Sequence, residues 1–159
     1  MPLPHDLAHV KNAATWCAVH LARRELAYAI SDCNYAIATE PRNPVGYSNR
    51  GALYLSYGDT AQALADFESA LKLAPDSPTS YFNRGLAHAT LGNSALAIAD
   101  YTEAIRLAPT MAIAFHNRGH EEEIQGDQMK AHADYARALA LDPKLTPSAE
   151  ALVRLRSQP

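Results

Sequence analysis

Aromatic, small and proline residues recur along the chain with a fixed period. Pro41, Pro75, Pro109 and Pro143 are separated by 34 residues each, and the register between them does not slip. Within one period the recurring residues are Tyr47, Gly51, Gly58, Ala63, Phe67 and Ala70, and residues of the same types lie 34 and 68 positions later. A period of this length, with apolar residues at helical spacing, predicts a stacked array of helix pairs.

Each period is predicted to hold two antiparallel helices joined by a tight turn. Asn43 is suited to cap a first helix that begins at Pro44 and runs for about 14 residues to Gly58, which tolerates the left-handed conformation common at helix ends. A second helix is expected to begin near Asp59 and to end before Pro75. Small residues in the middle of both helices allow the pair to approach closely. They are Gly51, Gly85 and Gly119 on the first helices and Ala63, Ala97 and Ala131 on the second helices.

The pattern divides residues 1–159, taken as a single domain, into four repeats and a final helix. The repeats are 10–43, 44–77, 78–111 and 112–145, and the final helix is 146–156. Repeat 10–43 is degenerate, because Ala13 stands where the others have an aromatic residue and Cys17 replaces the glycine. Segment 146–156 has a capped start, apolar spacing and basic residues at its end, which are typical of an amphipathic helix. We expect this helix to cap the array.

The recurring residues resemble the signature of the tetratricopeptide repeat family. Three repeats match its aromatic, glycine, alanine and proline positions nearly in full, and the degenerate repeat matches at Ala29, Ala36 and Pro41. The resemblance covers most of the chain and implies an all-α fold, a right-handed α-solenoid of stacked antiparallel helix hairpins. It also implies a concave groove lined by the first helices. The function that it implies is that of a non-catalytic protein interaction module, which binds a peptide or a helix of a partner and acts as an adaptor or scaffold.

Three asparagines recur at one position of the first helices and are candidate binding residues. They are Asn49, Asn83 and Asn117, and each amide is able to donate to and accept from a peptide backbone. Such a row is similar to the asparagine ladder by which some grooves of this family hold an extended peptide. The alternative interpretation is that these amides bond neighbouring helices or each other.

Phe82 and Leu86 flank the central asparagine and are candidate apolar anchors for a ligand. The alternative is that both side chains are buried against the adjacent hairpin. The family's two-carboxylate clamp for acidic chaperone C-termini is not expected. Its lysine and asparagine positions are occupied by Ala14 and Ala18, and Thr79 stands in place of a further lysine.

His116 and His120 lie one helical turn apart and are further candidates for partner binding, with Glu123 next on the same face. The spacing is compatible with a divalent metal, but no fixed third ligand is evident, so we expect polar groove residues and no metal. Glu121, Glu122 and Glu123 should favour protonated histidines. Binding at this end is therefore expected to depend on pH.

Arginine and aspartate recur together and predict ion pairs between helices. The arginines are Arg50, Arg84 and Arg118, and the aspartates are Asp32, Asp66, Asp100 and Asp134. Pairing within a repeat leaves Asp32 without an arginine. Pairing with the next repeat leaves Asp134 without one, unless Arg154 or Arg156 supplies it. Either arrangement has a structural role, in which desolvation offsets much of the attraction.

Cys17 and Cys33 lie on the two predicted helices of the degenerate repeat. A disulfide between them would argue for an oxidising compartment, whereas two small buried thiols would not. The residues after Met1 lack the features of a signal peptide. This favours a cytoplasmic protein if Met1 is the native start, and an extracytoplasmic one stays open if a signal peptide has been removed.

Composition narrows the classes of function. The 159 residues carry a formal net charge of -3 and are 48% hydrophobic, without an apolar run of the length that spans a bilayer. An acidic balance disfavours nucleic-acid and membrane-surface binding. The sequence has no phosphate-binding loop, nucleophile elbow or other enzyme motif, so neither catalysis nor a cofactor is expected. The alternatives to partner binding are self-association and, less favoured, metal binding through His116 and His120.

Overall fold

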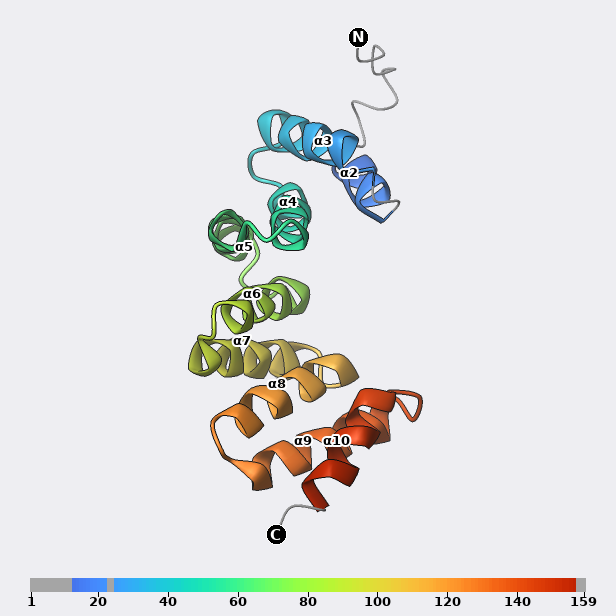
Figure 1. Ribbon diagram of the computed structural model, residues 1–159. Coiled ribbons are helices and arrows are strands. Elements are labelled where there is room, and N and C mark those ends of the chain that lie inside the picture. The colour runs from blue at the N-terminus through green and yellow to red at the C-terminus, as the bar shows by residue number, and fades with distance from the viewer. Residues whose placement is uncertain (1–12, 23–24, 157–159) are drawn as a thin grey trace. The chain divides into compact units, whose positions relative to one another are not determined.

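The computed structural model describes residues 13–22 and 25–156, and within these ranges every regular element is an α-helix (Figure 1). The helices confirm the predicted all-α fold of helix hairpins. They are α2 (Ala13–Ala22), α3 (Leu26–Thr39), α4 (Pro44–Ser56), α5 (Thr60–Leu73), α6 (Pro78–Thr90), α7 (Ser94–Leu107), α8 (Ala112–Ile124), α9 (Gln128–Leu141) and α10 (Thr146–Arg156).

The chain forms two compact units, the first ending at Pro75 and the second beginning at Asp76. In the first unit α2 packs on α3, α3 on α4, and α4 on α5, and α2 also contacts α4. In the second unit each helix from α6 to α10 packs on the next. Each unit is therefore built from hairpins in which a first helix (α2, α4, α6 or α8) is followed by its second helix (α3, α5, α7 or α9).

Local capping explains where the helices begin. The Asn43 side chain accepts a hydrogen bond from the Val45 amide at 3.1 Å, and the Ser77 hydroxyl accepts one from the Ser80 amide at 3.3 Å. Proline follows each cap, at a position where the helix needs no amide donor. Asp59 caps α5 in the same manner. The predicted helix starts at these caps are confirmed.

Glycine is required at two kinds of position in the hairpins α4–α5, α6–α7 and α8–α9. Gly58 at the turn has φ of 83°, in the left-handed region that other residues rarely adopt, as predicted. Within α4, a Cβ on Gly51 would lie 2.7 Å from the Phe67 ring of α5. The missing side chain thus lets this aromatic ring enter between the helices, and Phe67 is fully buried. Gly85 and Tyr101 have the same relation in the next hairpin.

The helices of the described ranges are short compared with a bilayer. None of them is both long enough and apolar enough to cross a membrane.

Candidate functional site

Each of the three regular hairpins contains an ion pair between its own two helices. Arg50 on α4 donates from Nε and Nη2 to the two carboxylate oxygens of Asp66 on α5, at 2.8 and 2.7 Å. Arg84 with Asp100, and Arg118 with Asp134, repeat this two-point geometry. These aspartates are buried. Of the two alternatives that the sequence left open, the structure has the pairing within a repeat, and the paired arginines are structural residues.

Asp32 of the degenerate repeat is paired with a histidine. Its Oδ2 lies 2.6 Å from Nδ1 of His20, across the α2–α3 hairpin. Trp16 stands at the position of the recurring arginine, and His20 lies one helical turn after it on α2. From the sequence, we expect Asp32 to lack a partner if pairing occurs within repeats, because that expectation considers only arginines as partners. The sequence signal for His20 is its place one turn after the missing arginine.

The three recurring asparagines have different environments. In the first unit, Asn49 on α4 donates to the Ala14 carbonyl oxygen of α2 at 3.0 Å, which ties two first helices together. In the second unit, the Asn117 amide on α8 interacts with the Tyr101 hydroxyl of α7 and favours its ionised form, against the larger effect of burial. Asn83 on α6 is part-exposed and makes no hydrogen bond with the described residues of its own unit. Asn49 thus follows the helix-bonding interpretation, whereas Asn83 has no such bond among the described residues of its own unit.

Phe82 and Leu86 are both half-buried on α6. The Phe82 ring packs against the Tyr101 ring of α7, with 5.7 Å between centroids. One part of Phe82 therefore contributes to its own hairpin, and another part remains exposed on the same helical turn as Asn83.

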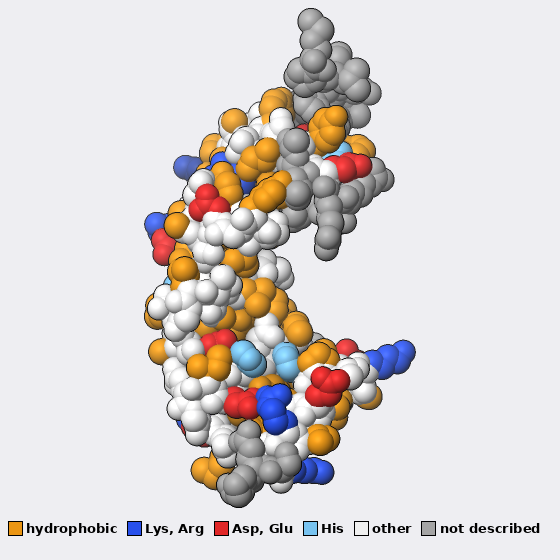
Figure 2. Space-filling view, in the orientation of Figure 1, with side chains coloured by type: hydrophobic (Ala, Val, Ile, Leu, Met, Phe, Trp, Pro, Cys, Tyr) orange, Lys and Arg blue, Asp and Glu red, His pale blue; other side chains and the backbone are white. Residues whose placement is uncertain are grey.

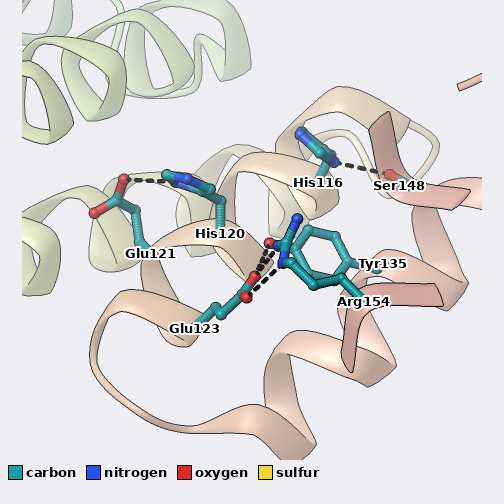
Figure 3. A network of polar contacts seen from close by, with 7 residues as sticks. All are labelled: His116, His120, Glu121, Glu123, Tyr135, Ser148 and Arg154. Atoms are coloured by element: carbon teal, nitrogen blue, oxygen red, sulfur yellow. Dashed lines mark hydrogen bonds and ion pairs between the residues drawn. The ribbon is translucent and has the colours of Figure 1, made fainter. Parts of the chain in front are cut away.

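A polar cluster joins α8, α9 and α10 in the second unit (Figure 3). Nδ1 of His116 lies 2.9 Å from the Ser148 hydroxyl of α10, and the His116 ring packs on Tyr135 of α9. His120 instead contacts the Glu121 carboxylate at 3.4 Å and is 55% exposed. Figure 3 shows the two imidazoles directed to these different partners. The histidines therefore share a helix face without converging on one point.

Glu123 fastens α10 to the hairpin before it. Its Oε2 accepts from the Tyr135 hydroxyl at 2.9 Å and from Nη2 of Arg154 at 2.7 Å, while Oε1 accepts from Nε of Arg154 at 3.2 Å. Burial opposes the charge, but the hydrogen bonds from Arg154 and Tyr135 lower the pKa of Glu123. In the described part of the chain no three histidine, cysteine or acidic side chains are placed to share a metal ion.

The expected effect of the glutamates on His116 is wrong. Burial, and after it the neighbouring His120, lower the pKa of His116 and favour its neutral form. The glutamates do not reverse this, because Glu123 is engaged with Arg154 and Glu121 faces His120.

Two further acids of α8 are buried. Glu121 and Glu122 are 5% and 8% exposed, at positions where α4 has Leu53 and Tyr54. Oε2 of Glu122 is buried without a hydrogen-bond partner, and burial together with the Asp134 carboxylate raises the pKa of Glu122. In Figure 2, histidine, acidic and basic side chains gather on the face over the α8–α10 part of the second unit.

Cys17 and Cys33, which the sequence left as free thiols or a disulfide, are bonded to each other between α2 and α3. Both residues are fully buried. The degenerate repeat thus has a covalent link where the other hairpins have a glycine against an aromatic ring.

Comparison with known proteins shows that this fold is that of tetratricopeptide repeat proteins. The sequence profile of the tetratricopeptide repeat family matches residues 49–112. A crystal structure of MamA protein, 18% identical, covers 92% of this chain and 80% of that chain with a TM-score of 0.80. TTC0263, a thermophilic tetratricopeptide repeat protein of Thermus thermophilus, is 21% identical over 94% of this chain and 82% of that chain, with a TM-score of 0.78.

A third similar solved structure has a peptide bound. It is the first repeat domain of Spaghetti (RPAP3) bound to the HSP90 peptide SRMEEVD, 23% identical over 72% of this chain and 90% of that chain, with a TM-score of 0.70. No curated protein matches the sequence. The described hairpins form the helical fold of protein interaction modules. Residues 49–112 match the tetratricopeptide repeat family, and the described chain has the fold of tetratricopeptide repeat proteins.

Proposed function

We propose that this chain is a non-catalytic adaptor or scaffold that binds a peptide or a helix of a partner protein. The binding residues are on the part-exposed faces of the first helices α6 and α8, which both pack on α7. Phe82, Asn83 and Leu86 of α6 supply apolar contact and an amide. His116, Asn117 and His120 of α8 supply polar contact at the other end.

The observation that carries this proposal is the composition of one turn of α6. Phe82 and Leu86 are half-exposed apolar side chains, and Asn83 between them has no hydrogen bond within the described part of its unit. An amide of this kind is able to bond a ligand backbone, while neighbouring apolar surface supplies affinity. Rigid helices hold these groups in place before the partner arrives, which reduces the ordering cost of binding.

The peptide-bound structural neighbour supports a peptide as the ligand of this fold. The residues that would recognise an acidic peptide tail are, however, not present in this chain. Ala14, Ala18 and Thr79 occupy the positions at which the family's clamp for acidic tails has lysine or asparagine. We therefore expect recognition through backbone and apolar contacts, with little dependence on acidic side chains.

Peptides selected from a random display library on the full chain test the proposal. For a selected peptide, Asn83→Ala is expected to weaken binding about tenfold, and the double variant Phe82→Ala, Leu86→Ala to weaken it further. Glu68→Ala, on the exposed side of α5, is the control and should leave the affinity unchanged. Selected peptides that bind all α6 variants like the wild type would rule out this face.

Measurement of the same affinity from about pH 5.5 to about pH 8 tests the contribution of α8, because histidine changes its charge in this range. A change in affinity that is absent from the variant His116→Gln, His120→Gln supports a role for these residues. An affinity that stays constant with pH in the wild type would remove them from the site.

A further inference from the structure

The last described helix occupies the place of a first helix in a fifth repeat. Thr146, where α10 begins, lies 34 residues after Ala112, where α8 begins, and Ser148 corresponds in register to Ser80 of α6. Ser148 and Ala151 are buried, and Leu152 and Leu155 pack on the cluster formed with Ala131 and Tyr135 of α9. One side of α10 is therefore anchored as the register predicts.

Among the described residues, no second helix covers the opposite side of α10, whereas α3, α5, α7 and α9 cover the first helices before it. Val153 stands in the register position of Gly51, Gly85 and Gly119, which are buried against the second helix of their own hairpin. Val153 is 68% exposed, and no second helix covers it within the described range. A capping helix is expected to have a polar outer side, so a large exposed apolar residue at this position indicates an interface.

The residues around Val153 are self-complementary in charge. Ala149, Glu150, Val153 and Arg154 lie at helical spacings of three and four residues and line one shallow hollow on α10. Glu150 is exposed, and the Arg154 side chain is 51% exposed while it bonds Glu123. Glu150 lies one helical turn before Arg154 on the same side of α10. When two copies of such a helix cross antiparallel, the acid of each copy comes to lie opposite the base of the other.

From this arrangement we propose that α10 is a self-association surface, whose occupant is α10 of a second copy of this chain. The two helices cross antiparallel about a twofold axis near residue 152. The two Val153 side chains meet beside this axis, and Glu150 of each copy lies opposite Arg154 of the other. Since α10 has only 11 residues, the interface is small and the dimer weak. This inference is independent of partner binding at α6 and α8.

Sedimentation equilibrium of the full chain, from about 10 µM to about 1 mM, tests the proposal. The average mass is expected to rise from the monomer value of 17.2 kDa towards twice that value. Val153→Glu should weaken association about tenfold or more, because it buries a charge at the centre of the interface. Ile124→Ser is the matched control: Ile124 is 61% exposed on α8, and Ser56 stands in its register position on α4. Association unaffected by Val153→Glu, or a monomer at every concentration, would overturn the proposal.

Charge exchange tests the antiparallel register. Glu150→Arg and Arg154→Glu should each weaken association, because like charges then face each other across the twofold axis. An equimolar mixture of the two variants should recover it, since both contacts become attractive again. Arg154 also bonds Glu123, so circular dichroism must show that Arg154→Glu keeps its helices. Failure of the folded variants to associate when mixed would rule out this register.

Discussion

At the scale of single residues, the recurring arginine matters most for the buried aspartate of its own hairpin. Among the described residues, it is the only cation that donates two hydrogen bonds to that aspartate. Arg84→Ala removes both bonds from Asp100 and leaves its carboxylate buried without that partner. We expect the free energy of unfolding to fall by about 2 to 5 kcal/mol, measured by denaturant titration. Arg106→Ala is the matched control, because Arg106 and Glu103 form an exposed pair, and it should cost less than about 0.5 kcal/mol. Similar losses in both variants would contradict a buried role for Arg84.

Glu122 is predicted to lower the stability of the protein near neutral pH. Burial, and after it Asp134, raise its pKa in the fold, so its proton is held more tightly in the folded chain than in the unfolded chain. This contribution to stability is complete below the unfolded pKa and is lost as the pH rises through the folded pKa. Glu122→Gln should therefore raise the free energy of unfolding at pH 7, with the difference vanishing near pH 4.

The measurement is a pair of denaturant titrations at the two pH values. Glu68→Gln, at an exposed site on α5, is the control and should change stability little at either pH. A Glu122→Gln variant that is no more stable than the wild type at pH 7 would show that Arg118 and Lys130 already compensate the Glu122 charge.

At the scale of helices, the disulfide replaces packing in the α2–α3 hairpin. Cys17 and Cys33 are 16 residues apart, and closing a loop of this length restricts the unfolded chain. Reduction is expected to destabilise this hairpin by about 3 kcal/mol, seen as earlier loss of helical signal on heating. Mass measurement after alkylation checks the bond directly. Thiols that react without a reductant in the unfolded protein would contradict it.

The Glu123 carboxylate contributes to the attachment of α10, beside the apolar packing of α10 on α9. Tyr135→Phe removes the hydroxyl that donates to Glu123 and changes the ring little, so it isolates this hydrogen bond. We expect it to cost about 0.5 to 1.5 kcal/mol and to speed amide hydrogen exchange in α10 more than in α6. Equal acceleration in both helices would mean that Tyr135 supports the unit as a whole, rather than α10 in particular.

The sequence predicted the helices well because their ends depend on neighbouring residues. Asn43 and Ser77 cap their own helices, and Gly58 ends one by its own conformation. The candidate site was harder to predict because its chemistry depends on contacts between helices. Equal spacing made the three asparagines look equivalent, yet the Asn49 amide donates to a carbonyl of α2, which sequence spacing alone does not reveal. His20 was missed because it does not stand at the position of the recurring arginine. It lies one helical turn later and still reaches Asp32.

At the scale of the whole chain, the two compact units contain their own packed hairpins. The fragment 76–159 includes all the contacts between consecutive helices from α6 to α10. We expect this fragment, expressed alone, to be helical and to unfold cooperatively, as measured by circular dichroism. The fragment 1–75, studied with its disulfide intact, provides the comparison. An unfolded 76–159 would show that its stability requires the preceding residues.

The pairing of charges inside each regular hairpin bears on how the gene could change in length. Arginine and aspartate of one pair are 16 residues apart and belong to the same 34-residue segment. Duplication or deletion of a segment therefore adds or removes both charges at once. If the pairs joined successive segments, the first and last segments would instead each keep one charge without a partner, whatever the number of segments. Recombination is thus able to alter the number of segments at little electrostatic cost.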